Sequence, residues 1–249
     1  MEEICAHTYS IVARCERSGE LGVAVASAVP AVGAICPYLR AGVGAVSTQS
    51  WVNPYLAVEV LDRLAEGAEA TEAVATVMSG DPAASVRQLG AIGARGAGAA
   101  FTGTDCTEAC GHAAAPDHAV QGNMLTGTDV LLGMSRAFTA ASDAPLDSRL
   151  LAALEAAQAT GGDKRGRQSA GLVVVGSEIY PRVDLRVDEH SDPVGELRRI
   201  HGVAALQLAP FVAGMPMRGR PAAAAPASVT EMLLRPPPER PGGGGSETP

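Results

Sequence analysis

The runs TYSIVAR at residues 8–14 and LGVAVAS at residues 21–27 decide the fold of this chain. A short polar turn over residues 15–20, which contains Gly19, joins them. Apolar runs joined by such a turn predict a β-hairpin. Further strand-like runs follow at residues 33–38 and 42–49, and their small residues predict strands that are buried on one face and closely covered on the other.

Helical and strand-like segments then alternate in blocks. Asn53 and Pro54 favour the start of a helix, because Asn caps free amides and Pro suits the first turn. We expect helices at about residues 54–65, 70–79, 128–141, 146–160 and 194–205, the last opened by Asp192-Pro193. We expect strands within residues 86–101, with a turn near 94–96, and at 119–124, 169–175 and 179–187.

This order of elements predicts the architecture. Strands in sequential runs with helices in pairs argue against an alternating βαβ fold and favour two sheets packed face to face, each covered by a helix layer. Residues 8–205 are expected to form this single domain, with residues 1–7 as a short leader. Beyond Pro210 the chain is rich in Ala, Pro, Arg and Gly, so we expect a disordered tail over residues 206–249.

The composition excludes several classes of partner. The 249 residues carry a formal net charge of -8, which argues against nucleic acid or an anionic membrane as a main partner. Aromatic residues make up 3% of the chain, so stacking on bases or sugars is not expected. A small-molecule substrate or ligand is favoured, and the small-residue surfaces of a packed sandwich are compatible with a homo-oligomer.

The five cysteines are scattered, and no signal peptide or apolar run of about 18 residues precedes them. This pattern predicts a cytoplasmic protein with reduced thiols. Cys106, Cys110 and His112 have the spacing of half a metal site but lack the second ligand pair of a structural zinc site, so we expect no metal. No cofactor is expected, because the dinucleotide, phosphate-loop, zinc-protease and nucleophile-elbow motifs are absent from the sequence.

A charged turn rich in glycine, GGDKRGRQSA at residues 161–170, enters the apolar run at 171–175. Loops at the end of a rigid sheet often hold binding or catalytic groups. Glycine and charge also mark ordinary solvated turns, so both interpretations remain open.

Thr8 stands at the start of the first strand. In a chain that began at Thr8, the α-amine would be placed to act as general base for the Thr8 hydroxyl, which is the arrangement of an N-terminal nucleophile. The alternative is a β-branched residue in an ordinary strand.

Six segments of the chain carry a family resemblance, at residues 8–14, 19–27, 41–49, 121–125, 161–170 and 180–188. They resemble the DUF1028 family, and the resemblance extends over about residues 8–200. The family is regarded as having the N-terminal nucleophile hydrolase type of fold, and its members are mostly uncharacterised. The resemblance therefore implies an α+β fold, a four-layer αββα sandwich of two stacked, mainly antiparallel sheets, and an analogy with amidohydrolases at the level of the fold.

The chain departs from the family pattern in three places. Family members commonly begin Met-Thr, so that removal of Met exposes the threonine corresponding to Thr8, whereas seven residues precede Thr8 here. Cys15 stands where Asp is frequent, and residues 107–110 stand where an aromatic residue is usual. Thr8 therefore becomes terminal only by cleavage after His7 or by a later start, or else its amine is not used.

Within the family frame, four residues have expected catalytic roles. Thr8 attacks a carbonyl carbon, and Ser27, at the end of the second strand, orients the Thr8 amine or hydroxyl. Gln49 and Asn123 lie at strand ends and donate amide hydrogens to an oxyanion. The alternatives are a turn-capping serine and two hydrogen-bonded core amides.

The charged turn supplies the expected substrate-binding residues, together with His112 as a base or substrate contact. These are Asp163, Arg165, Arg167, Gln168 and Ser169. One of the arginines clamps a substrate carboxylate through its planar guanidinium, or instead pairs structurally with Asp184 or Asp188. His112 has the alternative of a structural histidine.

The sequence thus predicts an N-terminal nucleophile hydrolase that cleaves an amide or related C-N bond of a small, carboxylate-bearing molecule. The alternative is a catalytically silent small-molecule-binding or assembly protein with the same fold. A hydrolase with another nucleophile, Ser10 or Cys5, is a third interpretation.

Overall fold

The computed structural model describes residues 8–220 and 224–234. The chain divides into one unit that ends at Arg199 and a second that begins at Ile200, and the predicted leader lies outside the described residues. The strands are β1 (Thr8–Arg14), β2 (Leu21–Ser27), β3 (Pro37–Arg40), β4 (Gly44–Ser50), β5 (Arg87–Gly93), β6 (Ala99–Thr102), β7 (Gly111–Ala114), β8 (His118–Gly122), β9 (Ser169–Val175) and β10 (Pro181–Val187). The helices are α1 (Val32–Ile35), α2 (Pro54–Ala65), α3 (Ala70–Gly80), the 3-10 helix η1 (Ala84–Val86), α4 (Asp129–Ala140), α5 (Leu146–Ala159), α6 (Pro193–Gln207), α7 (Ala209–Ala213) and α8 (Ala227–Leu234).

The predicted hairpin of β1 and β2 forms the middle of the larger sheet. Its strand order is β10-β9-β2-β1-β8-β7, and neighbouring strands are antiparallel. Thr8 pairs with Ser27 on β2, and Tyr9 pairs with Gly122 on β8. β1 therefore has a paired strand on each side almost from its first residue.

The smaller sheet has the order β3-β4-β5-β6 and is also antiparallel. Its central pair places Gln49 opposite Gln88 and Ser47 opposite Gly90. β4 and β5 pack against β1, β2 and β8, so the two sheets lie face to face. We call the space between them the interlayer.

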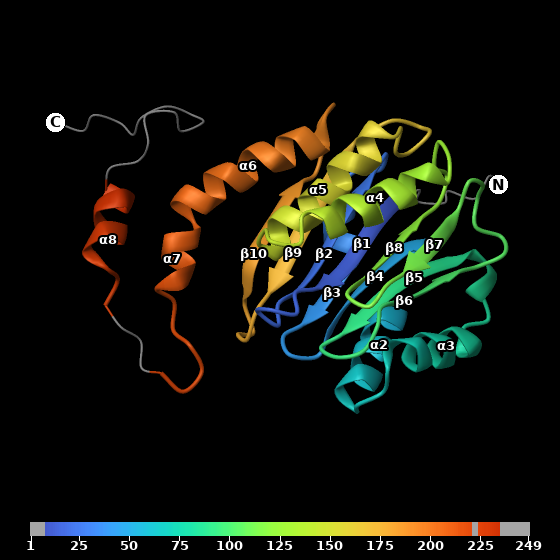
Figure 1. Ribbon diagram of the computed structural model, residues 1–249, viewed down its shortest axis with the longest axis horizontal. Coiled ribbons are helices and arrows are strands. Elements are labelled where there is room, and N and C mark those ends of the chain that lie inside the picture. Colours follow the sequence, from blue (N-terminus) through green and yellow to red (C-terminus); the bar gives the residue numbers. More distant parts are fainter. Residues whose placement is uncertain (1–7, 221–223, 235–249) are drawn as a thin grey trace. The chain divides into compact units, whose positions relative to one another are not determined.

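Two helix layers complete the first unit (Figure 1). α5 packs on β1, β2 and β9, and α4 packs on β7 and β8. α2 and α3 pack on the outer face of the smaller sheet, against β4, β5 and β6. The predicted αββα sandwich is confirmed. The close covering expected for the strand at residues 42–49 holds at Gly44, where a Cβ atom would lie 2.6 Å from Leu64 Cδ1.

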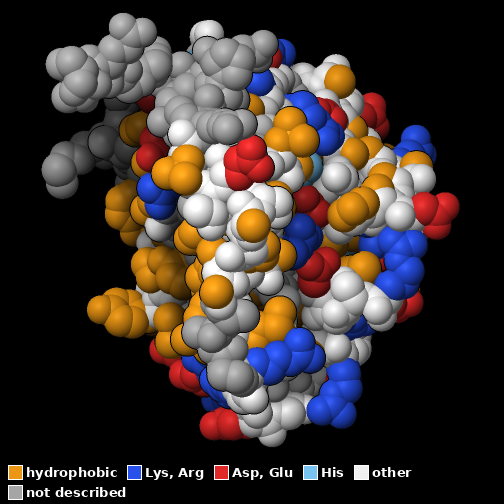
Figure 2. All heavy atoms as spheres, turned by 90° about the vertical axis from the view of Figure 1, so that its left-hand side faces the viewer, with side chains coloured by type: hydrophobic (Ala, Val, Ile, Leu, Met, Phe, Trp, Pro, Cys, Tyr) orange, Lys and Arg blue, Asp and Glu red, His pale blue; other side chains and the backbone are white. Residues whose placement is uncertain are grey.

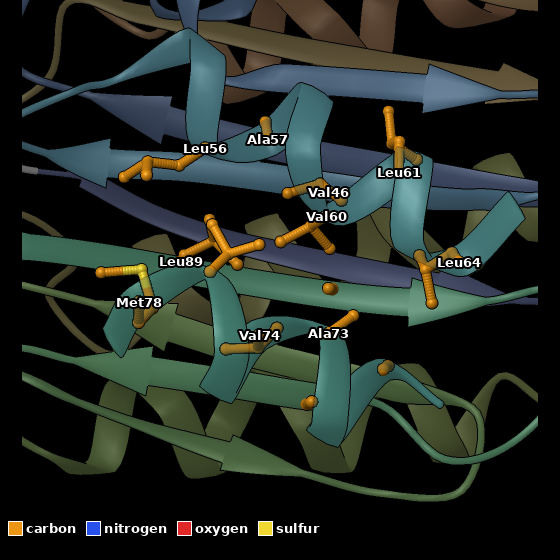
Figure 3. Packing of buried hydrophobic residues seen from close by; sticks show 14 residues of the cluster. Val46, Leu56, Ala57, Val60, Leu61, Leu64, Ala73, Val74, Met78 and Leu89 are labelled. Atoms are coloured by element: carbon orange, nitrogen blue, oxygen red, sulfur yellow. The ribbon is translucent and has the colours of Figure 1, made fainter. Parts of the chain in front are cut away.

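The apolar face of α2 shows why these residues form this layer. Asn53 caps the helix, because its side chain accepts the Tyr55 N–H at 3.1 Å. Apolar side chains recur at helical spacing and point toward the sheet, as Figure 3 shows for both α2 and α3. The buried cluster includes Val46, Leu56, Val60, Leu61, Leu64, Val74, Val77, Met78 and Leu89. Burial of each large aliphatic side chain contributes about 1.5–3 kcal/mol.

One local prediction was wrong, and one strand was missed. A single strand was expected at residues 33–38, whereas the chain forms α1 and then β3. α1 fits there because Gly33 lies against the larger sheet, where a Cβ atom would come within 3.0 Å of Gly171 Cα. β7 was not predicted, because its four residues alternate between half-buried and exposed and give no apolar signal.

The second unit contains the end of α6 together with α7 and α8. α7 and α8 lie within the segment for which the composition predicts disorder, and residues 221–223 and 235–249 of that segment lie outside the described residues. Figure 2 faces this part of the chain, and hydrophobic side chains are numerous in the view. Leu206, Phe211 and Leu234 are among the exposed ones. Among the described residues, every helix is too short or too polar to cross a bilayer.

Candidate functional site

All four predicted catalytic residues meet at one end of the sandwich. Thr8 begins β1, while Ser27 ends β2 and Gln49 lies next to the last residue of β4. Asn123 directly follows β8, and its N–H donates to Thr8 O at 3.1 Å. The Thr8 hydroxyl donates to Ser27 Oγ at 3.3 Å, and the Thr8 side chain is fully buried. We call this end of the sandwich the Thr8 edge.

Polar side chains fill the interlayer at this edge. Ser10 Oγ donates to Gln49 Oε1 at 2.5 Å and accepts from Gln121 Nε2 at 2.6 Å. Gln49 Nε2 donates to Gln88 Oε1 at 2.8 Å and to Thr8 O at 3.1 Å. These bonds join both sheets through four strands, and the side chains that form them are one hydroxyl and three carboxamides.

Gln88 makes the largest number of contacts in this cluster. Its Nε2 lies 2.9 Å from Gly122 O, 3.2 Å from Gly111 O and 2.9 Å from Thr102 Oγ1. Its Oε1 accepts from Asn123 Nδ2 at 2.8 Å as well as from Gln49. We refer to Ser10, Gln49, Gln88, Gln121 and Asn123 as the interlayer polar cluster.

Sequence reasoning assigned no role to Gln88 or Gln121 and named Ser10 only as an alternative nucleophile. The signal that could have found them is strand alternation, because residues two apart on a strand share a face. Thr8 with Ser10 and Gln121 with Asn123 are such pairs. The hydrogen bonds themselves link residues 39 and 111 positions apart, which no local pattern indicates.

Backbone strain gathers at the same edge. Ala31, Ser50 and Met124 are the described residues other than glycine with positive φ, at 52°, 64° and 48°. Ser50 is the last residue of β4, Met124 follows Asn123, and Ala31 lies four residues beyond Ser27. L-residues adopt this region at a cost, and such positions cluster at functional sites.

The charged turn at residues 161–170 crosses the ends of two of these strands. Asp163 forms an isolated bridge with Leu125, and its Oδ2 accepts the Ala28 N–H at 3.2 Å. Gln168 N–H donates to Ser27 O at 2.9 Å. The turn therefore contacts the segments that follow both Ser27 and Asn123, on either side of Thr8.

The arginines of the turn pair with other carboxylates than predicted. Arg165 Nη2 lies 2.8 Å from Asp163 Oδ2, and the Asp163 side chain is almost fully buried. Arg167 Nη1 lies 3.6 Å from Asp192 Oδ1, and both of these side chains are about half exposed. Structural pairing thus occurs, but with Asp163 and Asp192 in place of the predicted Asp184 or Asp188.

The last two residues of the turn have defined partners. Gln168 Nε2 donates to Glu189 Oε2 at 2.7 Å. Ser169 Oγ donates to Val29 O at 2.6 Å and accepts the Val32 N–H at 3.0 Å, which fixes the start of α1.

His112 connects to the interlayer polar cluster through a threonine. Its Nδ1 lies 2.8 Å from Thr102 Oγ1, the hydroxyl that Gln88 contacts. Burial lowers the pKa of His112. Cys106 Sγ donates to Arg87 O and Cys110 Sγ to Cys106 O, and within residues 8–220 and 224–234 no three metal-ligating side chains gather.

A second buried polar group lies on the opposite face of β8. His118 contacts Asp117 Oδ1 through Nδ1 at 2.7 Å and Ser135 Oγ through Nε2 at 2.8 Å. Arg149 binds Asp117 Oδ2 at 3.0 Å, and its guanidinium lies 3.8 Å above the Phe138 ring. These contacts tie α4 and α5 to the start of β8, away from the Thr8 edge.

The Thr8 edge brings hydroxyls and a carboxamide close together. It holds a hydroxyl at a strand end, a second hydroxyl in contact with it, and the Gln49 carboxamide, which donates to Thr8 O. Both Gln49 amide hydrogens have acceptors in Thr8 and Gln88, whereas Asn123 Nδ2 has one described acceptor and one hydrogen to spare.

Comparison with known proteins agrees with the resemblance seen in the sequence. The profile of a family of unknown function, DUF1028, matches residues 8–197. The crystal structure of protein SPO2555 from Silicibacter pomeroyi, a DUF1028 protein, superposes with a TM-score of 0.78 at 32% identity, over 85% of this chain and 95% of that chain.

Two Anbu structures are similar at a lower level. Anbu (ancestral beta-subunit) from Yersinia bercovieri matches with 13% identity and a TM-score of 0.39, over 84% of this chain and 98% of that one. The helical assembly of the Anbu complex from Pseudomonas aeruginosa matches with 14% identity and a TM-score of 0.38, over 85% of this chain and 100% of that one. No curated protein matches. The family profile and the SPO2555 structure show that the chain belongs to the DUF1028 family.

Proposed function

We propose that this protein is an N-terminal nucleophile hydrolase that cleaves an amide or related C-N bond of a small, carboxylate-bearing molecule. The position of Thr8 carries the proposal: it is the first residue of a central strand, and its hydroxyl contacts Ser27 Oγ at 3.3 Å. Cleavage between His7 and Thr8 frees the α-amine. The hydroxyl then attacks the substrate carbonyl and the α-amine takes its proton. The C-N bond breaks as the α-ammonium group returns this proton to the leaving amine, and an ester with Thr8 remains. Water then hydrolyses the ester to release the acid and restore the hydroxyl.

The residues around Thr8 have different supporting roles in this proposal. Ser27 orients the Thr8 hydroxyl through their contact. Asn123 donates its remaining amide hydrogen to the developing oxyanion. Gln49 is the weaker oxyanion donor of the two, because its amide hydrogens already bond Thr8 O and Gln88 Oε1; it holds the strand end in place.

The charged turn binds the substrate carboxylate in this proposal, and Arg167 is the better clamp. Arg165 is already paired with the buried Asp163, whereas Arg167 is half exposed and its nearest carboxylate lies at 3.6 Å. Asp163, Gln168 and Ser169 shape the turn through their contacts with Ala28, Glu189 and Val29. His112 serves as a substrate contact in its neutral form, which its lowered pKa favours.

The decisive experiment determines the N-terminus and the role of Thr8 together. Intact-mass analysis of the purified protein is expected to find a chain that starts at Thr8. Thr8→Ala is expected to abolish hydrolysis of a panel of small amides bearing a carboxylate while leaving the melting temperature within a few degrees. Thr76→Ala on the exposed surface of α3 is the matched control. A chain that still starts at Met1 or Glu2, with an active Thr8→Ala variant, overturns the proposal.

A catalytically silent binding or assembly protein is the second candidate. The burial of Thr8 favours it, because a fully buried hydroxyl that follows seven further residues is not yet open to substrate. Thermal-shift measurements against small amides and their acid products separate the two candidates. Lasting stabilisation by the amide without product formation favours the binder, and stabilisation that decays as acid appears favours the hydrolase.

The proposal also includes a cytoplasmic location and self-association. Among the described residues, no disulfide joins Cys15, Cys36, Cys106 or Cys110, which fits a reducing compartment. Exposed Leu206 and Phe211 supply apolar surface for self-association. Light scattering coupled to gel filtration tests the oligomeric state.

A further inference from the structure

One residue, Gln88, fixes the orientation of the carboxamides in the interlayer polar cluster. Its nitrogen donates to the carbonyl oxygens of Gly111 and Gly122, and a carbonyl oxygen can only accept. Gln88 Oε1 must then accept, and the groups it contacts on Gln49 and Asn123 must be nitrogens. The two oxygens of those carboxamides therefore face other neighbours.

The same reasoning extends to Gln121. Gln49 Oε1 accepts the Ser10 hydroxyl hydrogen, so Ser10 Oγ has only lone pairs to offer. The Gln121 atom in contact with Ser10 must therefore be its nitrogen. The carboxamides of Gln121 and Asn123 lie on this side of the interlayer. The oxygen of each one still needs a hydrogen-bond donor.

These two oxygens, Asn123 Oδ1 and Gln121 Oε1, are buried and have no hydrogen-bond partner among the described residues. The Gln121 and Asn123 side chains are fully buried as well. A buried acceptor without a donor is destabilising, so each such atom needs an explanation. Besides the spare hydrogen on Asn123 Nδ2, the cluster thus has two acceptors without a donor.

Asn123 is the one of the two that lies next to Thr8. Its backbone N–H donates to Thr8 O, and it follows Gly122, the partner of Tyr9. Residues opposite one another on antiparallel strands project to the same face, with Cβ atoms about 4.5–5.5 Å apart. Gln121 instead pairs with Ser10, two residues further along the ladder.

We propose that Asn123 Oδ1 is the acceptor reserved for the α-amine of Thr8 in the mature chain. The inference rests on the proposed function, because only cleavage after His7 creates this amine. Before cleavage the Thr8 nitrogen carries one hydrogen, and after cleavage it carries two when neutral and three when protonated. The added N–H groups are the donor that Asn123 Oδ1 lacks. For the amine, Asn123 is a positioning residue.

The proposal fixes the sign of an electrostatic effect. An acceptor beside the amine stabilises its protonated form. Asn123→Ala removes the acceptor and should move the titration of the amine to lower pH. Asn123→Asp replaces it with a charged acceptor and should move the titration to higher pH. A merely structural defect has no reason to move the titration in opposite directions in the two variants.

The experiment titrates the amine directly and needs no substrate. The mature chain is prepared with a removable tag cut directly before Thr8, and the 13Cα chemical shift of selectively labelled Thr8 is followed against pH. Opposite displacements in Asn123→Ala and Asn123→Asp support the proposal. Gln121→Leu is the matched control, since it removes the other unpartnered oxygen two residues along the ladder, and it should leave the titration in place.

The outcomes separate this inference from the proposed function. If the native chain never loses residues 1–7, the proposed function fails, while the engineered chain still reports on Asn123. If Asn123→Ala and Asn123→Asp titrate as the parent does, or if both move in the same direction, the assignment of Asn123 Oδ1 is wrong. Should Asn123→Ala fail to fold, Asn123→Ser and Asn123→Asp provide the comparison, and a titration unchanged in both overturns the assignment.

Discussion

Gln88→Leu is expected to destabilise the protein by about 3 kcal/mol, although the two side chains have similar volumes. The wild-type side chain bonds Gly111 O, Gly122 O and Thr102 Oγ1 through its nitrogen and two carboxamides through its oxygen. After the substitution, Thr102 Oγ1 keeps its hydrogen bond with His112 Nδ1, and Gln49 Nε2 keeps its hydrogen bond to Thr8 O. Asn123 Nδ2 loses the acceptor described for it.

The magnitude follows from these losses. An orphaned buried amide costs roughly 1–3 kcal/mol, and each ordinary hydrogen bond that is lost costs about 1 kcal/mol. Burial of the leucine methyl groups offsets part of the total, at about 25 cal/mol per Å² of apolar surface. The net loss is therefore about 3 kcal/mol, a large fraction of the stability of a typical domain.

Urea denaturation followed by circular dichroism measures this change. Gln207→Leu, on α6 in the second unit, is the matched control and should change the unfolding free energy by less than about 0.5 kcal/mol. If Gln88→Leu is as stable as that control, the hydrogen bonds of Gln88 do not hold the two sheets together, and the orientation argument built on them fails.

Two further predictions concern the same end of the sandwich. Gly90→Ala should lower stability by about 2 kcal/mol, because the added Cβ would lie 2.5 Å from Gln121 Nε2. Gly80→Ala is the control and should have little effect, since the space around Gly80 is open. Equal melting temperatures for the two variants would contradict this packing. Burial raises the pKa of Asp81, but hydrogen bonds from Arg87 and from the Ala83 N–H, together with the Arg87 charge, lower this pKa below its usual value. The contribution of ionised Asp81 to the free energy of unfolding is therefore complete above about pH 4. It is lost as the pH falls through the lowered pKa. Asp81→Asn should therefore reduce stability at pH 7 and flatten the acid part of the stability curve, as thermal melts between pH 2 and 7 will report; a curve as steep as that of the parent would refute this.

The sandwich could be predicted because its signals are local. Two apolar runs and a turn predict the hairpin of β1 and β2, and the pair Asn53 and Pro54 predicts the start of α2. α1 could not be predicted, because four residues carry no helical period. Its placement depends on the approach of Gly33 to Gly171, two glycines that are 138 positions apart in the chain.

The site was predictable in part for a similar reason. Thr8, Ser27 and Asn123 were recognisable as polar residues at strand ends, and the structure brings them together. The role of Gln88 depends on hydrogen bonds to carbonyl groups of β7 and β8, and β7 itself leaves no apolar signal. The partners of Arg165 and Arg167 depend on turn geometry, which the charges alone do not determine.

The interlayer changes character along the strands, and that change is the strongest argument that the Thr8 edge has a function. Toward the far ends of the same strands the two sheets meet through Val12, Val23, Ala45, Ile92 and Ala119. Toward the Thr8 edge, residues at the same alternation on β1, β4, β5 and β8 are hydroxyls, amides or glycine.

The fold by itself does not require this polar half. An apolar continuation would bury the same positions without unsatisfied oxygens, and exchanging both partners of a buried hydrogen bond for apolar groups is often neutral or stabilising. Instead the chain keeps two unsatisfied carboxamide oxygens and three residues with positive φ at this end. Local features that oppose stability and gather at one place are expected where a site needs them. The polar half of the interlayer therefore singles out the Thr8 edge as the place where a functional site is expected.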